Sequence, residues 1–178
     1  KHSVVQPESK RNIREHGSTA FTYWNSTYAT DKPAMRHRAV AWACDSNDIK
    51  GYLFWGICAW GRGNPFDEPA IFIRDNVMQS WSPGNGWLIY PSPDGKEILS
   101  SIRFEMFRDS FEDYDYLTLL KEMMEANIPL KVFREGQALL QKAHLLVPQI
   151  TEYPEPEELL AVRNEIGSFL DKHSRYIK

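Results

Sequence analysis

The stretch SIRFEMFRDSFEDYDYL, residues 101–117, decides how this chain is interpreted. It mixes two arginines and several carboxylates with aromatic and aliphatic side chains. Apolar residues recur three and four positions apart, which predicts a long helix, capped by Ser100 or Ser101 and ending near Ala126. Six side chains form its expected buried face: Met106, Phe107, Phe111, Tyr114, Leu117 and Leu120.

Charged residues fill the rest of this predicted helix. Arg108 has Glu105 three residues before it and Glu112 four residues after it, so both pairs can meet on the helix surface. A charged helix face is usually solvated, and we prefer that interpretation to a catalytic carboxylate on the helix. The spacing alone therefore places no active site here.

Two further helices follow this one, over about Leu130–Leu146 and Pro156–Ile177. Before it, a strand over Thr19–Trp24, a helix over Pro33–Ala43 capped by Asp31, and a strand over Gly51–Trp60 form a β-α-β unit. The second strand is apolar nearly throughout, which is typical of a parallel strand buried on both faces.

Residues 61–95 are rich in glycine and proline and predict a long irregular loop with one short strand over Trp87–Tyr90. Long loops in compact domains are often functional. The chain has six tryptophans among its 178 residues. Because tryptophan is costly to expose, a ring outside the core points to a flat ligand or a partner.

Composition excludes several classes of function. The net charge is −3 and no basic stripe is present, so we expect no nucleic-acid partner. The longest apolar run, Tyr52–Trp60, is too short to span a bilayer, so we expect no membrane insertion. Cys44 and Cys58 are too few for a disulfide framework, and the five histidines lack metal-ligand spacing, so no metal and no cofactor are expected. The chain begins with Lys1, and the absence of a signal segment leaves the compartment open.

Two segments together resemble the catalytic domain of glycoside hydrolase family 123, long catalogued as a domain of unknown function. The first is HRAVAWACDSNDIKGYLFWGICAWG, residues 37–61, and the second is GNGWLIYPSPDG, residues 84–95, with the helix from Ser101 to Leu120. The resemblance covers roughly Gly17 to the C-terminus. It implies the C-terminal portion of a (β/α)8 TIM barrel, an α/β fold, containing the last two strands and their helices in residues 1–126. Residues 127–178 are then a C-terminal helical extension that packs on the barrel.

The resemblance implies cleavage of β-linked N-acetylgalactosamine by a substrate-assisted retaining mechanism. In the family, an adjacent Asp–Glu pair on a mid-barrel strand orients the 2-acetamido group and supplies the general acid and base. That strand precedes the present segment, so we assign no catalytic residue here. The adjacent pair Asp67–Glu68 follows the last strand and is interpreted as a solvated loop pair.

The segment is expected to supply an aromatic wall of the sugar site, because barrel sites form at the carboxyl ends of the strands. The candidate substrate-binding residues are Tyr23, Trp24, Trp55, Trp60 and Tyr90. Strand alternation sends Tyr23 and Trp24 to opposite faces, and Tyr23 matches the family pattern. The apolar Ile57-Cys58-Ala59, where the family often has a polar Asn, weakens any polar contact there.

Three interpretations remain open: part of a hexosaminidase, inactive alone; a non-catalytic carbohydrate-binding remnant; and a protein-interaction scaffold built on the C-terminal helices. The expected partners are a glycan and the N-terminal remainder of the same barrel. The resemblance implies a bacterial periplasmic or extracellular location.

Overall fold

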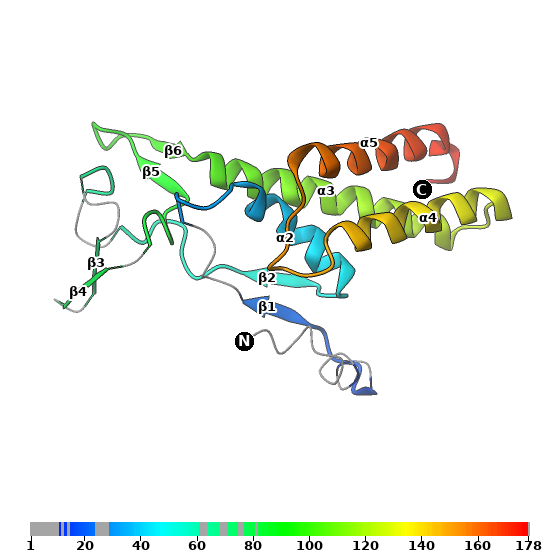
Figure 1. The fold of residues 1–178 in the computed structure, drawn as a ribbon, viewed down its shortest axis with the longest axis horizontal. Helices are drawn as coiled ribbons and strands as arrows, with labels where there is room; N and C mark the ends of the chain where they lie inside the picture. Colours follow the sequence, from blue (N-terminus) through cyan, green and yellow to red (C-terminus); the bar gives the residue numbers. More distant parts are fainter. Residues whose placement is uncertain are drawn as a thin grey trace.

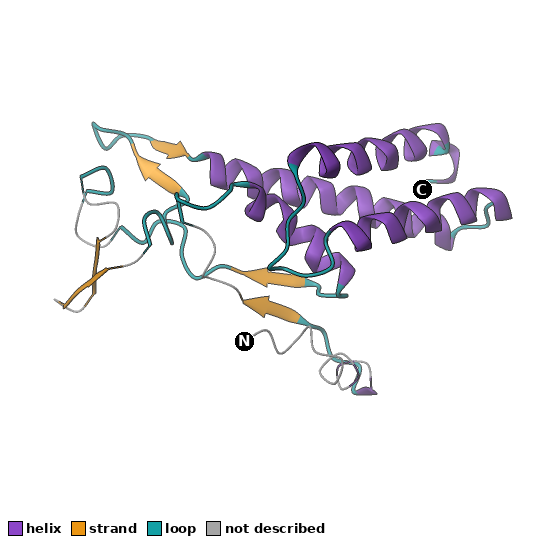
Figure 2. Ribbon diagram, viewed as in Figure 1, coloured by secondary structure: helices purple, strands orange, loops and turns teal. Residues whose placement is uncertain are grey.

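The computed structural model describes residues 11, 13, 15–23, 29–60, 64–67, 71–74, 77–80 and 82–177. Within them the fold is mixed α/β, with long helices on one side and short strands on the other (Figures 1 and 2). The elements are β1 (Phe21–Tyr23), α2 (Met35–Ser46), β2 (Gly51–Leu53), β3 (Ile71–Arg74), β4 (Val77–Ser80), β5 (Ile89–Pro91), β6 (Ile98–Ser100), α3 (Ile102–Glu125), α4 (Leu130–Leu146), α5 (Pro156–Lys172) and the 3-10 turn η2 (Ser174–Tyr176).

The predicted β-α-β unit is present. Strands β1 and β2 pair in parallel, with Phe21 opposite Gly51 and Tyr23 opposite Leu53, and α2 connects them. The strand predicted over Gly51–Trp60 is wrong in its length, because β2 ends at Leu53. Beyond Leu53, Phe54 packs against the ring of Phe107 on α3, and residues 55–60 make contacts with another loop rather than a strand ladder.

Helices cover only one face of this two-stranded sheet in the described part of the chain. Ala20 belongs to a buried cluster with Val40 of α2 and Phe107 of α3, and Tyr52 packs against the same cluster. The opposite face is largely exposed: 65% for Phe21, 51% for Tyr23 and 56% for Leu53. The expected burial on both faces is therefore not met by the described residues alone.

The segment predicted as an irregular loop, residues 61–95, contains one antiparallel hairpin and the first strand of a second. Strand β3 pairs with β4, and β5 pairs with β6. The second hairpin turns through residues 92–97, where Ser92 and Asp94 accept hydrogen bonds from backbone amides. These strands have only three or four residues each, too few for a clear period-two pattern.

The starts of the predicted C-terminal helices are confirmed, but α5 ends at Lys172 rather than Ile177. The buried face predicted for α3 is wrong at Phe111, which is 53% exposed. Helix α3 begins after Ser101, whose side chain accepts a hydrogen bond from the Phe104 amide, and α4 spans the predicted residues. Helix α5 begins at Pro156 with a capping box between Glu155 and Glu158. The predicted Asp31 cap is wrong, because α2 starts after Ala34 without a side-chain cap.

One apolar core joins α2 to the three C-terminal helices. Buried members come from all four: Trp42, Leu117, Leu120, Ala143, Leu159 and Ile166. Helices α4 and α5 therefore pack directly on α2 and α3, and all four share one core.

A buried carboxylate lies at the centre of this helical layer. The Asp113 side chain is fully buried on α3 and accepts hydrogen bonds from Arg38 of α2 and Arg163 of α5, at 2.9 and 2.6 Å from their Nε atoms. Trp42 also donates to it from its indole, at 3.1 Å. Asp113 raises the pKa of Arg38 through this hydrogen bond. Two cations on one carboxylate thus connect three helices.

Candidate functional site: an aromatic loop pair

The parallel strands β1 and β2 end at the same edge of their sheet, and the chain after β2 continues beyond that edge toward the two hairpins (Figure 1). Two segments meet there, residues 54–60 and 82–91, which we call the loop pair. An isolated antiparallel bridge between Cys58 and Trp87 joins them. The Ala59 amide donates to the Gly86 carbonyl at 3.0 Å, and the Leu88 amide donates to Ile57 at 2.8 Å.

Each of the three tryptophans in the loop pair donates its indole N–H across to the other segment. Trp55 donates to the Asn85 amide oxygen at 3.2 Å. Trp60 donates to the carbonyl of Ile89 at 2.9 Å. Trp87 donates to the carbonyl of Ala59 at 2.7 Å. The indole N–H groups thus hold the loops together. The Trp87 ring is buried, at 3% exposed, whereas the rings of Trp55 and Trp60 are half-buried.

Two glycines permit the close approach of the segments. Gly84 and Gly86 have φ angles of +72° and +82°, in the region that favours glycine. A Cβ on Gly86 would lie 2.4 Å from a ring carbon of Trp55. The Trp55 ring therefore lies directly on this turn.

Arg103, in the first turn of α3, holds residues 82–91 in place through hydrogen bonds. Its guanidinium donates to the carbonyls of Gly84 and Trp87, each at 2.5 Å, and to the Tyr90 hydroxyl at 2.8 Å. Burial lowers the pKa of Arg103, and Tyr90 partly offsets that effect. Ser101 adds a hydrogen bond from its hydroxyl to the Leu88 carbonyl at 2.6 Å. The start of α3 and the loop pair are therefore one connected unit.

The structure brings together three of the five predicted wall residues. Trp55, Trp60 and Tyr90 all belong to the loop pair and are half-buried. Tyr23 lies on β1, on the sheet face turned away from α2, beside Leu53 in the parallel register. Trp24 lies outside the described residues.

Four contributors were missed by the sequence analysis: Phe66, Asn85, Trp87 and Arg103. The rings of Phe66 and Tyr90 lie 5.5 Å apart. The sequence position of Arg103 could have indicated its role. The helix dipole opposes a cation in the first turn of a helix, so an arginine there is expected to have a compensating contact. Asn85 had a signal too, lying between the two glycines of the turn.

The loop pair carries no carboxylate, imidazole, ammonium or guanidinium group of its own. Neither 54–60 nor 82–91 contains an acidic or basic residue. Asp67 is exposed in a nearby turn, and Glu68 lies outside the described residues. In the described ranges, no group of three or more histidine, cysteine or acidic residues could hold a metal ion. None of the described helices is long and apolar enough to cross a membrane.

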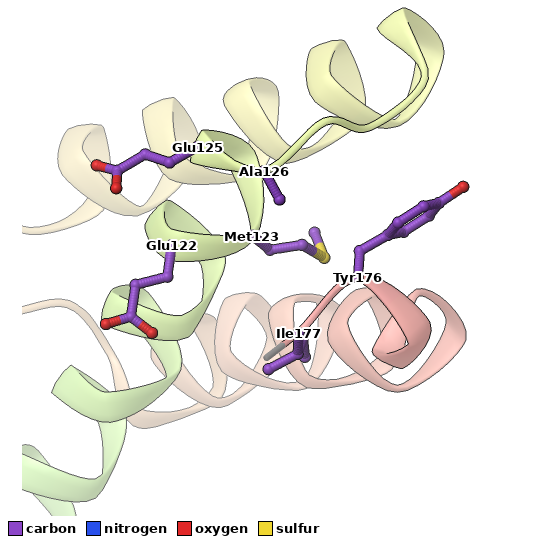
Figure 3. A pocket seen from close by; sticks show the side chains of 6 residues that line it. All are labelled: Glu122, Met123, Glu125, Ala126, Tyr176 and Ile177. Atoms are coloured by element: carbon purple, nitrogen blue, oxygen red, sulfur yellow. The ribbon is translucent and has the colours of Figure 1, made fainter.

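A separate cavity of about 350 Å³ lies at the other end of α3 (Figure 3). Met123 points toward the base of the Tyr176 side chain, whose ring extends away from it, and the carboxylates of Glu122 and Glu125 lie on the opposite side. Nineteen residues of helix, roughly 30 Å, separate Glu122 from Arg103. The cavity is therefore not part of the loop-pair site.

These features define a mixed α/β domain with an aromatic surface at the carboxyl ends of parallel strands, a common location for small-ligand sites. A family model described as "Glycoside hydrolase 123, catalytic domain" matches residues 2–120, which include β1, β2 and the whole loop pair. The chain therefore belongs to this glycoside hydrolase family. No curated protein matches the chain.

Proposed function

We propose that this chain is the C-terminal portion of a (β/α)8 barrel, with β1 and β2 as its last two strands. The parallel β1-α2-β2 unit is the repeating unit of such a barrel. The exposed apolar face formed by Phe21, Tyr23 and Leu53 supports this, because the face away from the helices fills the interior of a closed barrel. Residues 1–126 are the barrel part, and residues 127–178 are a helical extension packed on it.

The partner of this sheet is then the N-terminal remainder of the same barrel. Within the described residues, β1 and β2 pair only with each other, so each has an unpaired outer edge. Exposed edges of apolar strands favour aggregation, and barrel closure removes them. Further parallel strands beside β1 and β2 would cover both the edges and the exposed face.

The proposed reaction is hydrolysis of β-linked N-acetylgalactosaminides by the substrate-assisted retaining mechanism of the family. The loop pair supplies the aromatic wall of the sugar site: Trp55, Trp60 and Tyr90, with Tyr23 on the barrel interior. A pyranose packs its C–H groups on an aromatic face. The one observation that carries this proposal is that the rings of Trp55, Trp60 and Tyr90 gather beyond the carboxyl ends of the parallel strands, inside the matched residues.

The loop pair contains no carboxylate, which agrees with catalytic acids on another barrel strand. The test is hydrolysis of an aryl β-N-acetylgalactosaminide. We expect no turnover by the 178-residue chain. Turnover that disappears on changing Asp67→Asn together with Glu68→Gln would place the catalytic pair in this segment and contradict the proposal.

The wall itself is tested with Tyr23→Phe and Trp60→Ala in the protein that carries activity. We expect lower activity per folded molecule in both variants. The melting temperature should change little in Tyr23→Phe and fall modestly in Trp60→Ala, which loses the hydrogen bond to Ile89. If Trp60→Ala mainly lowers the melting temperature and leaves activity per folded molecule intact, Trp60 is a core residue. If the chain binds sugar and even the full-length protein lacks a catalytic Asp–Glu pair, the non-catalytic carbohydrate-binding alternative is favoured.

A further inference from the structure

We propose that Arg103 is the positioning residue of the aromatic wall: its guanidinium fixes the turn from Gly84 to Tyr90 and directs the Tyr90 hydroxyl hydrogen toward a bound sugar. This inference rests on the proposed function of the loop pair. It adds a residue outside the wall that acts on sugar binding through Tyr90.

The geometry of the guanidinium supports this role. Arg103 is 4% exposed and reaches three oxygens on the second segment of the loop pair. The carbonyls of Gly84 and Trp87 lie three residues apart in the turn, and the Tyr90 hydroxyl is the third acceptor. A planar fork with several fixed donors can serve three such acceptors together, whereas a lysine ammonium on a flexible stem cannot reproduce the arrangement.

The position of Arg103 is unfavourable without these contacts. The first turn of a helix repels a cation, and burial removes water from the guanidinium. The turn also fits the arginine closely, since a Cβ on Gly84 would lie 2.6 Å from Nη1. The contacts to the turn are what stabilise a buried cation at this place.

The hydrogen bond to Tyr90 sets the chemical role of that phenol. A guanidinium can only donate, so the Tyr90 oxygen accepts from it. The phenol hydrogen is then left to donate to an acceptor on a ligand, such as a sugar hydroxyl. Phe66, with its ring 5.5 Å from that of Tyr90, limits the tilt of the phenol ring.

The first measurement reports on the turn and needs no sugar. In protein labelled with ¹⁵N-tryptophan, the indole N–H groups of Trp60 and Trp87 report on the loop pair, and that of Trp42, bound to Asp113, is the internal reference. Losing a hydrogen bond to a charged group shifts the equilibrium between the closed and the open loop by roughly ten- to a hundredfold. We expect Arg103→Met to speed exchange of the two loop indoles by about that factor and to leave Trp42 unchanged.

Two further variants show whether the fork is required. Arg103→Lys should give an intermediate effect. The control is Arg108→Met, because Arg108 lies five residues along the same helix and its side chain is exposed. This variant should not change the exchange rate of either loop indole. Exchange in Arg103→Met or Arg103→Lys that matches the wild type would overturn the inference.

The second measurement is the affinity for N-acetylgalactosamine. Arg103→Met and Tyr90→Phe should each weaken it about tenfold or more. The double variant should lose less than the product of the two effects, because both single changes remove the same contact of the Tyr90 hydroxyl. Effects that multiply fully, or wild-type binding that survives Arg103→Met, would overturn the inference. If the wild type binds no sugar, the proposed function itself fails, whereas the indole exchange still reports on the turn. If Arg103→Met does not fold, Arg103→Lys, which keeps the charge but not the planar fork, carries both measurements with its smaller expected effects.

Discussion

Replacing Asp113 by alanine should destabilise the protein more than any surface substitution. The fully buried Asp113 side chain accepts hydrogen bonds from Arg38, Trp42 and Arg163. Hydrogen bonds to a charged group contribute about 1.5–3 kcal/mol each, and their sum here would approach the whole free energy of unfolding of a domain. That sum is too large, because water solvates the same groups in the unfolded chain. Removing one partner of a buried ion pair costs about 3–5 kcal/mol, and we expect that loss in the free energy of unfolding.

The assay is urea unfolding followed by far-ultraviolet circular dichroism. The matched control is Glu112→Ala, the adjacent residue on α3, whose side chain is 56% exposed and pairs with Arg108 at 3.6 Å. That variant should cost about 0–1 kcal/mol. Values for the two variants that lie within 1 kcal/mol of each other would refute the reasoning, because burial and the paired arginines would then contribute nothing.

Three further results are expected. Burial, with a contribution from a nearby arginine, lowers the pKa of His37 to about 3. Between pH 3 and about 6.5 the His37 imidazole is protonated only in the unfolded chain, so the free energy of unfolding should fall by about 2 kcal/mol from pH 7 to pH 5. In unfolding measured against pH, His37→Gln should reduce this fall. Gly86→Ala should lower the melting temperature more than Gly95→Ala, because both glycines have positive φ but only the first has a tryptophan ring within 4 Å of the added Cβ, and equal losses would contradict the close approach. Cys58 is exposed, whereas burial raises the pKa of Cys44 to about 12, so a thiol reagent should modify one cysteine in the native protein and two after unfolding; equal native rates would contradict this burial.

The sequence predicts the helices well because their signals are local. Periodic apolar residues, the Ser101 cap and Pro156 at the start of α5 lie within a few residues of the features they determine. The surface pairs of Arg108 with Glu105 and Glu112 are also present as predicted. The parallel pairing of β1 and β2 was predicted from the apolar run that begins at Tyr52 and from the helix between the two strands.

The missed features depend on partners distant in the sequence. Asp113 looks like one more charge on a solvated face, and only Arg38 and Arg163, 75 and 50 residues away, show it to be buried. In the same way, residues 54–60 look like a strand until they meet residues 82–91. Composition and period cannot anticipate a pairing between two glycine-containing loops.

The most direct test of the central claim, that the loop pair binds a sugar ring, is saturation-transfer NMR of N-acetylgalactosamine with the 178-residue chain. We expect transfer to the ring C–H protons at millimolar sugar, equivalent to about 4 kcal/mol of binding free energy. Trp60→Leu should abolish it in a chain that is still folded, with a lower melting temperature because the hydrogen bond to Ile89 is lost. Phe133→Leu, on an exposed part of α4, should not affect the transfer. No transfer to a folded chain, or transfer that persists in Trp60→Leu, would contradict the account.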